Sequence, residues 1–197
     1  MESKFYWLLD NGHGKSTPGK RSPVFEDKSQ LFEYEFNRDI VGKIAKKLNN
    51  LKIYNHIIVP EIEDISLDER VTRANNFETP IKKIFLSIHA NAHLDGSDWT
   101  PAHGIESYFF RPYSQSERLA QIFQSELITH TGLKDRGTKQ ANFYVLKYTK
   151  MLAVLTENGF YTNRIECEKL LNQKWREAIA DAHVSAIQAI EKMGYNI

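Results

Sequence analysis

Short, almost continuous apolar runs recur along this chain, and amphipathic helical patterns separate them. Runs with few polar residues are typical of strands that are covered on both faces. The alternation of such strands with helices predicts a single α/β domain, in which helices flank both faces of a mostly parallel six-stranded sheet. The expected strands are residues 4–10, 52–59, 83–89, 105–110, 143–147 and 152–157. The expected helices are residues 29–49, 66–77, 115–131 and 165–193.

Length and composition are those of an ordinary globular domain. The chain has 197 residues, of which 41% are hydrophobic and 26% charged, and no repeat or Gly/Ser linker divides it. We therefore expect residues 1–197 to form one domain with a substantial core. The net charge of +1 gives no sign of a general nucleic-acid binder. The single cysteine, Cys167, excludes an internal disulfide.

The sequence carries no sign of membrane insertion or of a secretory leader. No apolar run approaches the roughly 20 residues that a membrane-spanning helix needs. The apolar run near the N-terminus is short, and Asp10 interrupts it, so it does not resemble a signal peptide. We therefore expect a protein that is made in the cytoplasm, or a domain excised from a longer protein.

Three of the expected strands end close to residues that are suited to catalysis. His13 follows the first strand in "LLDNGHG", His89 ends the third in "FLSIHANAH", and Glu157 ends the last in "AVLTENGF". Ligands of open α/β sheets bind beyond the carboxyl ends of the strands. A parallel sheet would bring all three residues to one edge. The two glycines beside His13 would let a ligand or a metal approach the backbone closely.

The first expected helix contains a carboxylate on its apolar face. With about 100° per residue, the apolar positions from Phe32 to Leu48 occupy an arc centred near roughly 90°, measured from Phe32. Glu33 falls at about 100°, inside that arc, whereas Glu35 falls at about 300° on the polar face. A carboxylate that faces the core must be paired, protonated or bound to a metal. Glu33 is therefore a candidate functional residue, and Glu35 is interpreted as a solvated surface charge.

Two histidines and one carboxylate form the kind of set that binds a catalytic metal. Catalytic zinc takes three protein ligands and keeps a further position for water. His13, Glu33 and His89 supply such a set, so we expect one Zn²⁺ ion, which would activate water and polarise a substrate carbonyl. A base is then needed to take a proton from water and return it to the leaving nitrogen. Glu157 is the candidate for this role.

Seven short blocks of the sequence resemble a known enzyme family. The chain is similar to the zinc-dependent N-acetylmuramoyl-L-alanine amidases of the amidase-3 family, of the AmiC and CwlV type. The blocks occur in the family's order and extend from about residue 10 to residue 163. They are "DNGHGK", "EYEFN", "LDERVTRAN", "SIHANA", "GIESYFF", "RGTKQANFYVL" and "LTENGFYTN".

This resemblance implies a site and an activity. It implies that His13, Glu33 and His89 bind zinc and that Glu157 is the catalytic carboxylate. It also implies hydrolysis of the amide between N-acetylmuramic acid and L-alanine in bacterial peptidoglycan. The bare catalytic domain resembles a phage endolysin, which acts on the cell wall after release by another route. We expect a monomer with peptidoglycan as its partner, without nucleic acid or membrane insertion.

The sequence departs from the family pattern at a few positions. Lys15 stands where the family usually has a second glycine after the Gly-His-Gly motif, and Leu152 stands where it usually has a proline. Val59 and Pro60 replace a Thr-Arg pair. None of these changes removes an expected ligand, but they leave the subgroup and the finer substrate preference open.

Each candidate residue also has a simpler interpretation. His13 could be a turn residue, His89 a capped core histidine, Glu33 the partner of a buried cation, and Glu157 a cap of the turn that follows it. Their occurrence together favours the metal site.

Three residues near these motifs are candidates for supporting roles or for none. Asn91 is a candidate hydrogen-bond donor to substrate or to a metal ligand. Lys139 is a candidate anchor for a substrate carboxylate or carbonyl, with a solvated loop lysine as the equal alternative. His93 is interpreted as a loop residue near the cleft, because the H-E-x-x-H pattern is absent.

Two other functions are compatible with the same fold. A non-catalytic peptidoglycan-binding or regulatory module would be expected to lack a ligand or the catalytic glutamate, and all four positions are filled. A zinc peptidase acting on the stem peptide would use the same residues on a different amide bond. The position of the newly formed amino group distinguishes the peptidase from the amidase.

Overall fold

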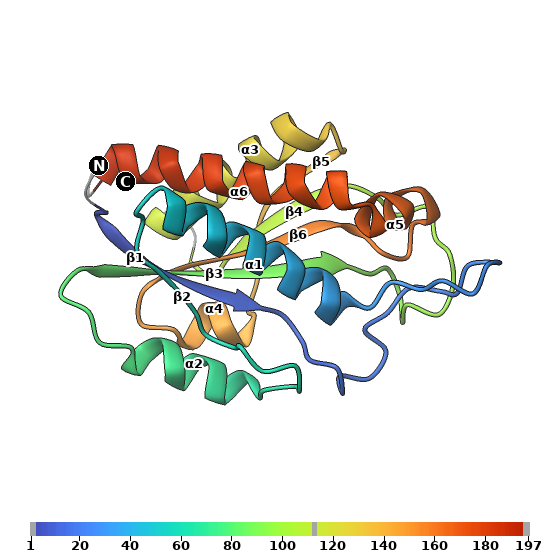
Figure 1. Ribbon diagram of the computed structural model, residues 1–197, viewed down its shortest axis with the longest axis horizontal. Coiled ribbons are helices and arrows are strands. Elements are labelled where there is room, and N and C mark those ends of the chain that lie inside the picture. The colour runs from blue at the N-terminus through green and yellow to red at the C-terminus, as the bar shows by residue number, and fades with distance from the viewer. Residues whose placement is uncertain (1–2, 112–113, 195–197) are drawn as a thin grey trace.

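The computed structural model describes residues 3–111 and 114–194. It confirms a single α/β domain with a mostly parallel six-stranded sheet (Figure 1). The strand order is β2-β1-β3-β6-β4-β5, and all neighbours are parallel except β4 and β6, which are antiparallel. The strands are β1 (Phe5–Asn11), β2 (Asn55–Ile57), β3 (Lys82–Asn91), β4 (Ile105–Phe109), β5 (Asp135–Gln140) and β6 (Leu152–Phe160).

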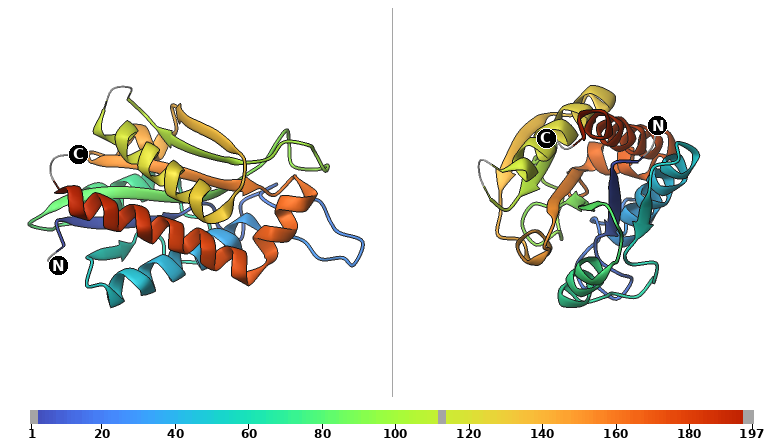
Figure 2. Two further views of the ribbon diagram at one scale, coloured as in Figure 1. Left: turned by 90° about the horizontal axis from the view of Figure 1, so that it is seen from above. Right: turned by 90° about the vertical axis from the view of Figure 1, so that its left-hand side faces the viewer.

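Helices cover both faces of the sheet, as predicted. Figures 1 and 2 show α1, α3, α5 and α6 on one face, and α2 and α4 on the other. The helices are α1 (Glu33–Asn50), α2 (Leu67–Asn76), α3 (Gln115–Thr131), α4 (Tyr144–Tyr148), α5 (Arg164–Leu171) and α6 (Gln173–Met193). Among the described residues, none of these helices combines the length and the apolar character needed to cross a bilayer.

Successive residues of the central strands enter two separate cores. Trp7 and Leu9 of β1 pack in the core beneath α1, α3 and α6, whereas Leu8 packs in the core beneath α2 and α4. Side chains alternate between the faces of a sheet, so a strand covered on both faces needs apolar residues at consecutive positions. This is why the central strands read as nearly continuous apolar runs.

One predicted strand is wrong, and one strand is absent from the prediction. Residues 143–147 were expected to form a strand, but Phe143 caps the short helix α4, which buries Val145 and Leu146 against the sheet. A short apolar run fits either element, so its pattern does not separate them. The sixth strand is instead β5, whose sequence DRGTKQ is polar because it lies at the sheet edge and is only partly buried.

Most other boundaries shift by a few residues, and two elements differ more from the predicted ranges. β2 is only three residues long, within the expected range 52–59. The expected helix 165–193 consists of α5 and α6, which are separated by Asn172. Asn172 has an extended backbone, and its side chain accepts a hydrogen bond from the backbone N–H of Lys174 at the start of α6. The asparagine therefore caps a new helix instead of continuing the preceding one.

Candidate metal centre

The expected site residues lie at the carboxyl edge of the parallel strands, as the topology predicts. His13 follows the end of β1, and His89 of β3 is in register with Glu157 of the neighbouring strand β6. The two strands continue slightly beyond these residues, to Asn91 and Phe160. His89 and Glu157 therefore take their positions from the hydrogen-bonded ladder rather than from a loop.

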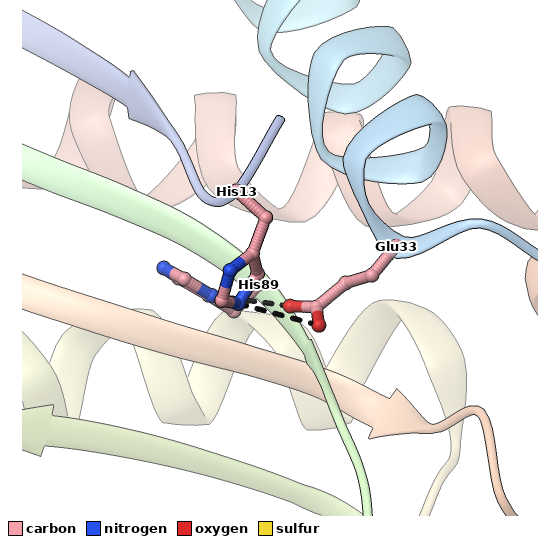
Figure 3. A group of neighbouring side chains, drawn as sticks. All are labelled: His13, Glu33 and His89. Atoms are coloured by element: carbon pink, nitrogen blue, oxygen red, sulfur yellow. Dashed lines mark hydrogen bonds and ion pairs between the residues drawn. The ribbon is translucent and has the colours of Figure 1, made fainter. Parts of the chain in front are cut away.

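His13, Glu33 and His89 converge although 76 residues separate the first from the last. Glu33 Oε2 lies 3.4 Å from His13 Nε2, and Glu33 Oε1 lies 3.1 Å from His89 Nδ1 (Figure 3). One ligand atom from each side chain lies within 4.8 Å of the other two. The two imidazole rings are nearly perpendicular, at 89°. These atoms are close enough to share one metal ion.

Glu33 faces the interior and Glu35 faces solvent, as the helical periodicity predicts. Glu33 is the first residue of α1 and is only 1% exposed. Its backbone N–H donates to the carbonyl of Lys20 at 3.0 Å, which fixes the start of the helix. Asn37, one turn later, donates from Nδ2 to the carbonyl of Gly12 at 3.0 Å. These contacts attach the helix start to the loop that carries His13.

The Gly-His-Gly loop is held by two arginines. His13 itself adopts the left-handed backbone conformation, with φ at +61°, which is uncommon for a residue other than glycine. Its carbonyl accepts hydrogen bonds from Arg38 Nη1 at 2.9 Å and from Arg70 Nη2 at 3.2 Å. These contacts stabilise the strained backbone that directs the His13 ring toward Glu33.

The two glycines make room for other parts of the protein. A Cβ atom on Gly12 would lie 2.1 Å from Cε1 of the His89 ring, which packs flat against this residue. A Cβ atom on Gly14 would lie 2.2 Å from the backbone of Asp64. The glycines beside His13 were expected to admit a ligand, but Gly12 instead admits the second histidine.

Burial and mutual contact change the proton affinities of the three side chains. Burial lowers the pKa of His13 to about 4, although the charge of Glu33 partly opposes this effect. Burial alone would lower the pKa of His89 and raise that of Glu33. Their hydrogen bond and opposite charges outweigh burial, so the pKa of His89 is raised and that of Glu33 is lowered. The carboxylate is thus ionised, as a metal ligand must be.

Glu157 is a half-buried residue whose carboxyl group has a buried, unused oxygen. Within the described part of the chain, its Oε2 atom has no hydrogen-bond partner. Burial raises the pKa of Glu157 to about 8, and the nearby charges of Glu33 and Glu106 act in the same direction, against those of His89 and Lys20. Such a group can hold and release a proton near neutral pH, which is the property of a general acid–base catalyst.

A cavity of about 520 Å³ opens onto these residues. Its wall includes His13, His89 and Glu157, and also the exposed aromatic rings of Phe143 and Tyr144 in and beside α4. Lys20 also lines it. A substrate in this cavity can therefore touch the metal-ligand group and the carboxyl group of Glu157 at the same time.

Asn91 and Lys139 meet at a glutamate that sequence analysis missed. Asn91 Nδ2 donates to Glu106 Oε2 at 3.0 Å, and Lys139 Nζ forms an ion pair with Glu106 Oε1. Glu106 lies on β4 directly opposite Glu157 and is only 3% exposed. A carboxylate inside the apolar run "IESYFF" was the signal that could have identified it. His93 is exposed in the loop after β3, as predicted.

The residues present fit a zinc ion. Two imidazoles and one carboxylate are ordinary zinc ligands, and three protein ligands are the number found in catalytic sites. The Glu33 carboxylate is buried, and Gly12 leaves the space that the His89 ring needs to reach it. Both the chemistry of the donor set and its packing are therefore compatible with the metal.

Comparison with known proteins places the chain in a family. LytC, an N-acetylmuramoyl-L-alanine amidase of Bacillus subtilis, is 35% identical over 177 residues, which are 89% of this chain and 33% of LytC. The endolysin of Bacillus phage SPP1 is 28% identical over 95% of this chain and 66% of its own length. The present chain thus spans about a third of LytC.

Solved structures show the same fold. The crystal structure of the N-acetylmuramoyl-L-alanine amidase from Clostridium difficile 630 aligns with a TM-score of 0.82 and 32% identity, covering 95% of this chain and 97% of that one. The family model described as N-acetylmuramoyl-L-alanine amidase (Amidase_3) matches residues 8–189, which include every residue of the candidate site. The chain therefore belongs to the N-acetylmuramoyl-L-alanine amidase family, Amidase_3.

Proposed function

We propose that this protein is a zinc-dependent amidase that hydrolyses the bond between N-acetylmuramic acid and L-alanine in bacterial peptidoglycan. The observation that carries the proposal is the convergence of His13, Glu33 and His89 beside the carboxyl group of Glu157, whose Oε2 atom is buried and unpaired among the described residues. Membership of the amidase family and the names of LytC and of the Clostridium difficile enzyme support the choice of bond. Peptidoglycan is accordingly the proposed partner, and the cell wall the proposed place of action.

His13, Glu33 and His89 would hold the zinc ion. When bound, zinc would polarise the substrate carbonyl and make water a better nucleophile near neutral pH. The buried Glu33 carboxylate supplies the negative charge of the site, while the pKa of His13, lowered to about 4, keeps that imidazole neutral and ready to bind metal. Glu33 and His13 are thus already in the protonation states that bind a metal, whereas His89, whose pKa is raised, would release a proton when the ion binds.

Glu157 would move the proton. Its free Oε2 atom would take a proton from the attacking water, and the same carboxyl group would then donate it to the nitrogen of L-alanine as the amide C–N bond breaks. The atoms balance, since water supplies a hydroxyl to the carbonyl carbon and a proton to the amine. Burial, which raises the pKa of Glu157 to about 8, suits this group to both steps.

Purified peptidoglycan provides the test. Mass spectrometry of the fragments that the protein releases should show stem peptides with a free amino group on L-alanine and glycan strands with intact N-acetylmuramic acid. Complete removal of zinc with a chelator should stop the release, and added zinc should restore it.

Three other outcomes would contradict the proposal. Release that survives complete zinc removal would exclude zinc dependence. New amino groups on an internal stem residue would identify a peptidase instead, and binding to the wall without any released fragment would identify a non-catalytic module.

A further inference from the structure

A row of polar side chains extends from the His89 ring into the sheet, on the face that α2 covers. Asp10 of β1 and Ser87 of β3 are register partners, and His89 follows Ser87 by two positions, so their side chains share a face. Ser87 Oγ lies 2.6 Å from Asp10 Oδ2, and His89 Nε2 lies 3.2 Å from Ser87 Oγ. Asp10 and Ser87 are both buried. The residues two positions earlier on the same face of these strands, Leu8 and Phe85, are apolar, so the two polar side chains stand out.

A buried arginine fixes the far end of this row. Arg70 of α2 is only 2% exposed, and its Nη1 atom donates to Asp10 Oδ1 at 2.7 Å and to the Asn11 carbonyl at 2.7 Å. Its Nη2 atom donates to the carbonyl of His13. One guanidinium group therefore neutralises Asp10 and also holds the loop of the other histidine.

Hydrogen-bond chemistry gives this row a direction. An ion-paired carboxylate only accepts hydrogen bonds, so the Ser87 hydroxyl must donate its proton to Asp10. The Ser87 oxygen then has lone pairs to accept from His89, so Nε2 carries a proton. The other ring nitrogen, Nδ1, faces the ionised Glu33 carboxylate at 3.1 Å and donates to it in the metal-free protein, so a metal ion bound between these two groups would replace the proton on Nδ1.

We propose that Asp10 and Ser87 are positioning residues that keep a proton of His89 on Nε2 and thereby make Nδ1 the nitrogen that binds the metal. The inference rests on the proposed function, because it assigns the metal-binding nitrogen of the proposed zinc site. Groups that hydrogen-bond to the second nitrogen of a ligand histidine orient its ring and strengthen metal binding. The row thus explains why polar residues interrupt the apolar face of β1 and β3 beside the site.

Removal of the Ser87 hydroxyl tests the proposal, with a second buried serine as the matched control. Ser107 of β4 is equally buried, and its hydroxyl donates to Gln124 Oε1 at 2.8 Å on the face of the sheet that α3 covers. Zinc affinity of Ser87→Ala and Ser107→Ala would be measured by competition with a chromophoric chelator. We expect Ser87→Ala to bind zinc roughly 10- to 100-fold more weakly than wild type, while Ser107→Ala keeps wild-type affinity.

Nuclear magnetic resonance of the zinc-loaded wild type gives a second readout that does not depend on the folding of a variant. Nitrogen-15 spectra should show the His89 ring with a proton on Nε2 and metal on Nδ1. Metal on Nε2 would overturn the proposal, as would a Ser87→Ala affinity equal to that of Ser107→Ala. A wild-type protein that takes up no zinc would contradict the proposed function as well, so the two failures are distinguishable.

Discussion

Gly12 is the residue on which the packing of His89 depends most closely. The flat contact between its backbone and the imidazole leaves no space for a side chain, since a Cβ atom would lie 2.1 Å from the ring. The limit is steric rather than conformational, because Gly12 does not have the positive φ of its neighbour His13. The Gly-His-Gly motif therefore supplies His13 itself and also the space that the ring of His89 occupies.

Gly12→Ala should displace the His89 ring and weaken zinc binding by tenfold or more, on the order expected when a ligand loses its orientation. Chelator competition on the purified variant would measure this. Gly42→Ala on the exposed side of α1 is the control, because a Cβ atom there meets nothing within 4 Å. The control should keep zinc affinity and gain about 0.5–1 kcal/mol of stability from the helix propensity of alanine. Unchanged zinc affinity of Gly12→Ala would contradict this packing.

Glu157→Gln tests the proton-transfer role separately from metal binding. The amide keeps the shape of the side chain but cannot take the proton of the attacking water, so peptidoglycan hydrolysis should fall by roughly 10²- to 10⁴-fold. Zinc affinity should stay near that of wild type, because Glu157 is not one of the three converging ligands. A variant that releases fragments at the wild-type rate would exclude Glu157 as the base.

The positions of single residues could be predicted from the sequence where they follow from the helical repeat or from the parallel arrangement of the strands. The inward position of Glu33 followed from the helical repeat, and the shared edge of His13, His89 and Glu157 followed from the parallel sheet. Glu106 was missed because its partners lie on other strands, and hydrogen bonds between distant segments leave no period in the sequence.

At the scale of the elements, the predicted secondary structure was wrong for two segments whose hydrophobic pattern does not match the element that they form. The run 143–147 is apolar enough for a strand, yet it forms α4 because the chain turns there to cover the face shared with α2. β5 has a polar sequence, and it forms a strand only because β4 offers it a free edge. In both cases the neighbouring element, rather than local propensity, decides the structure.

Helix α6 contains a histidine that should make stability depend on pH. Burial lowers the pKa of His183 to about 4, although a hydrogen bond with the carbonyl of Ile179 partly opposes this. In the unfolded chain, the His183 side chain takes up a proton near pH 6.5. In the folded chain, it does so only near pH 4. The contribution of His183 to the free energy of unfolding is therefore complete above pH 6.5. It falls by up to about 1.4 kcal/mol per pH unit as the pH drops toward 4.

His183→Gln should flatten this part of the pH profile. Urea unfolding of the metal-free protein at several pH values between 7.5 and 4.5 would measure the slope for wild type and variant. His130→Gln, at an exposed position of α3, serves as the matched control for the exchange of histidine for glutamine. Equal slopes for wild type and His183→Gln would show that other groups cause the acid sensitivity.

At the scale of the whole molecule, the proposed metal would join segments that the chain keeps far apart. The ligands come from the loop after β1, the first residue of α1 and the carboxyl end of β3. Only the folded chain brings them together, so zinc should bind the native state far better than the unfolded state. Binding of this kind stabilises a protein by RT ln(1 + [L]/Kd).

Zinc should accordingly raise the melting temperature of the protein. At a free zinc concentration of 100 times Kd, the gain is about 2.7 kcal/mol, which corresponds to roughly 5–10 °C for a domain of this size. Scanning calorimetry with zinc and with excess chelator would measure the difference. His89→Ala is the control, since the loss of one of three ligands should remove most of the shift. A wild-type protein that melts at the same temperature in zinc and in chelator would show that the three side chains hold no ion, however close their atoms lie.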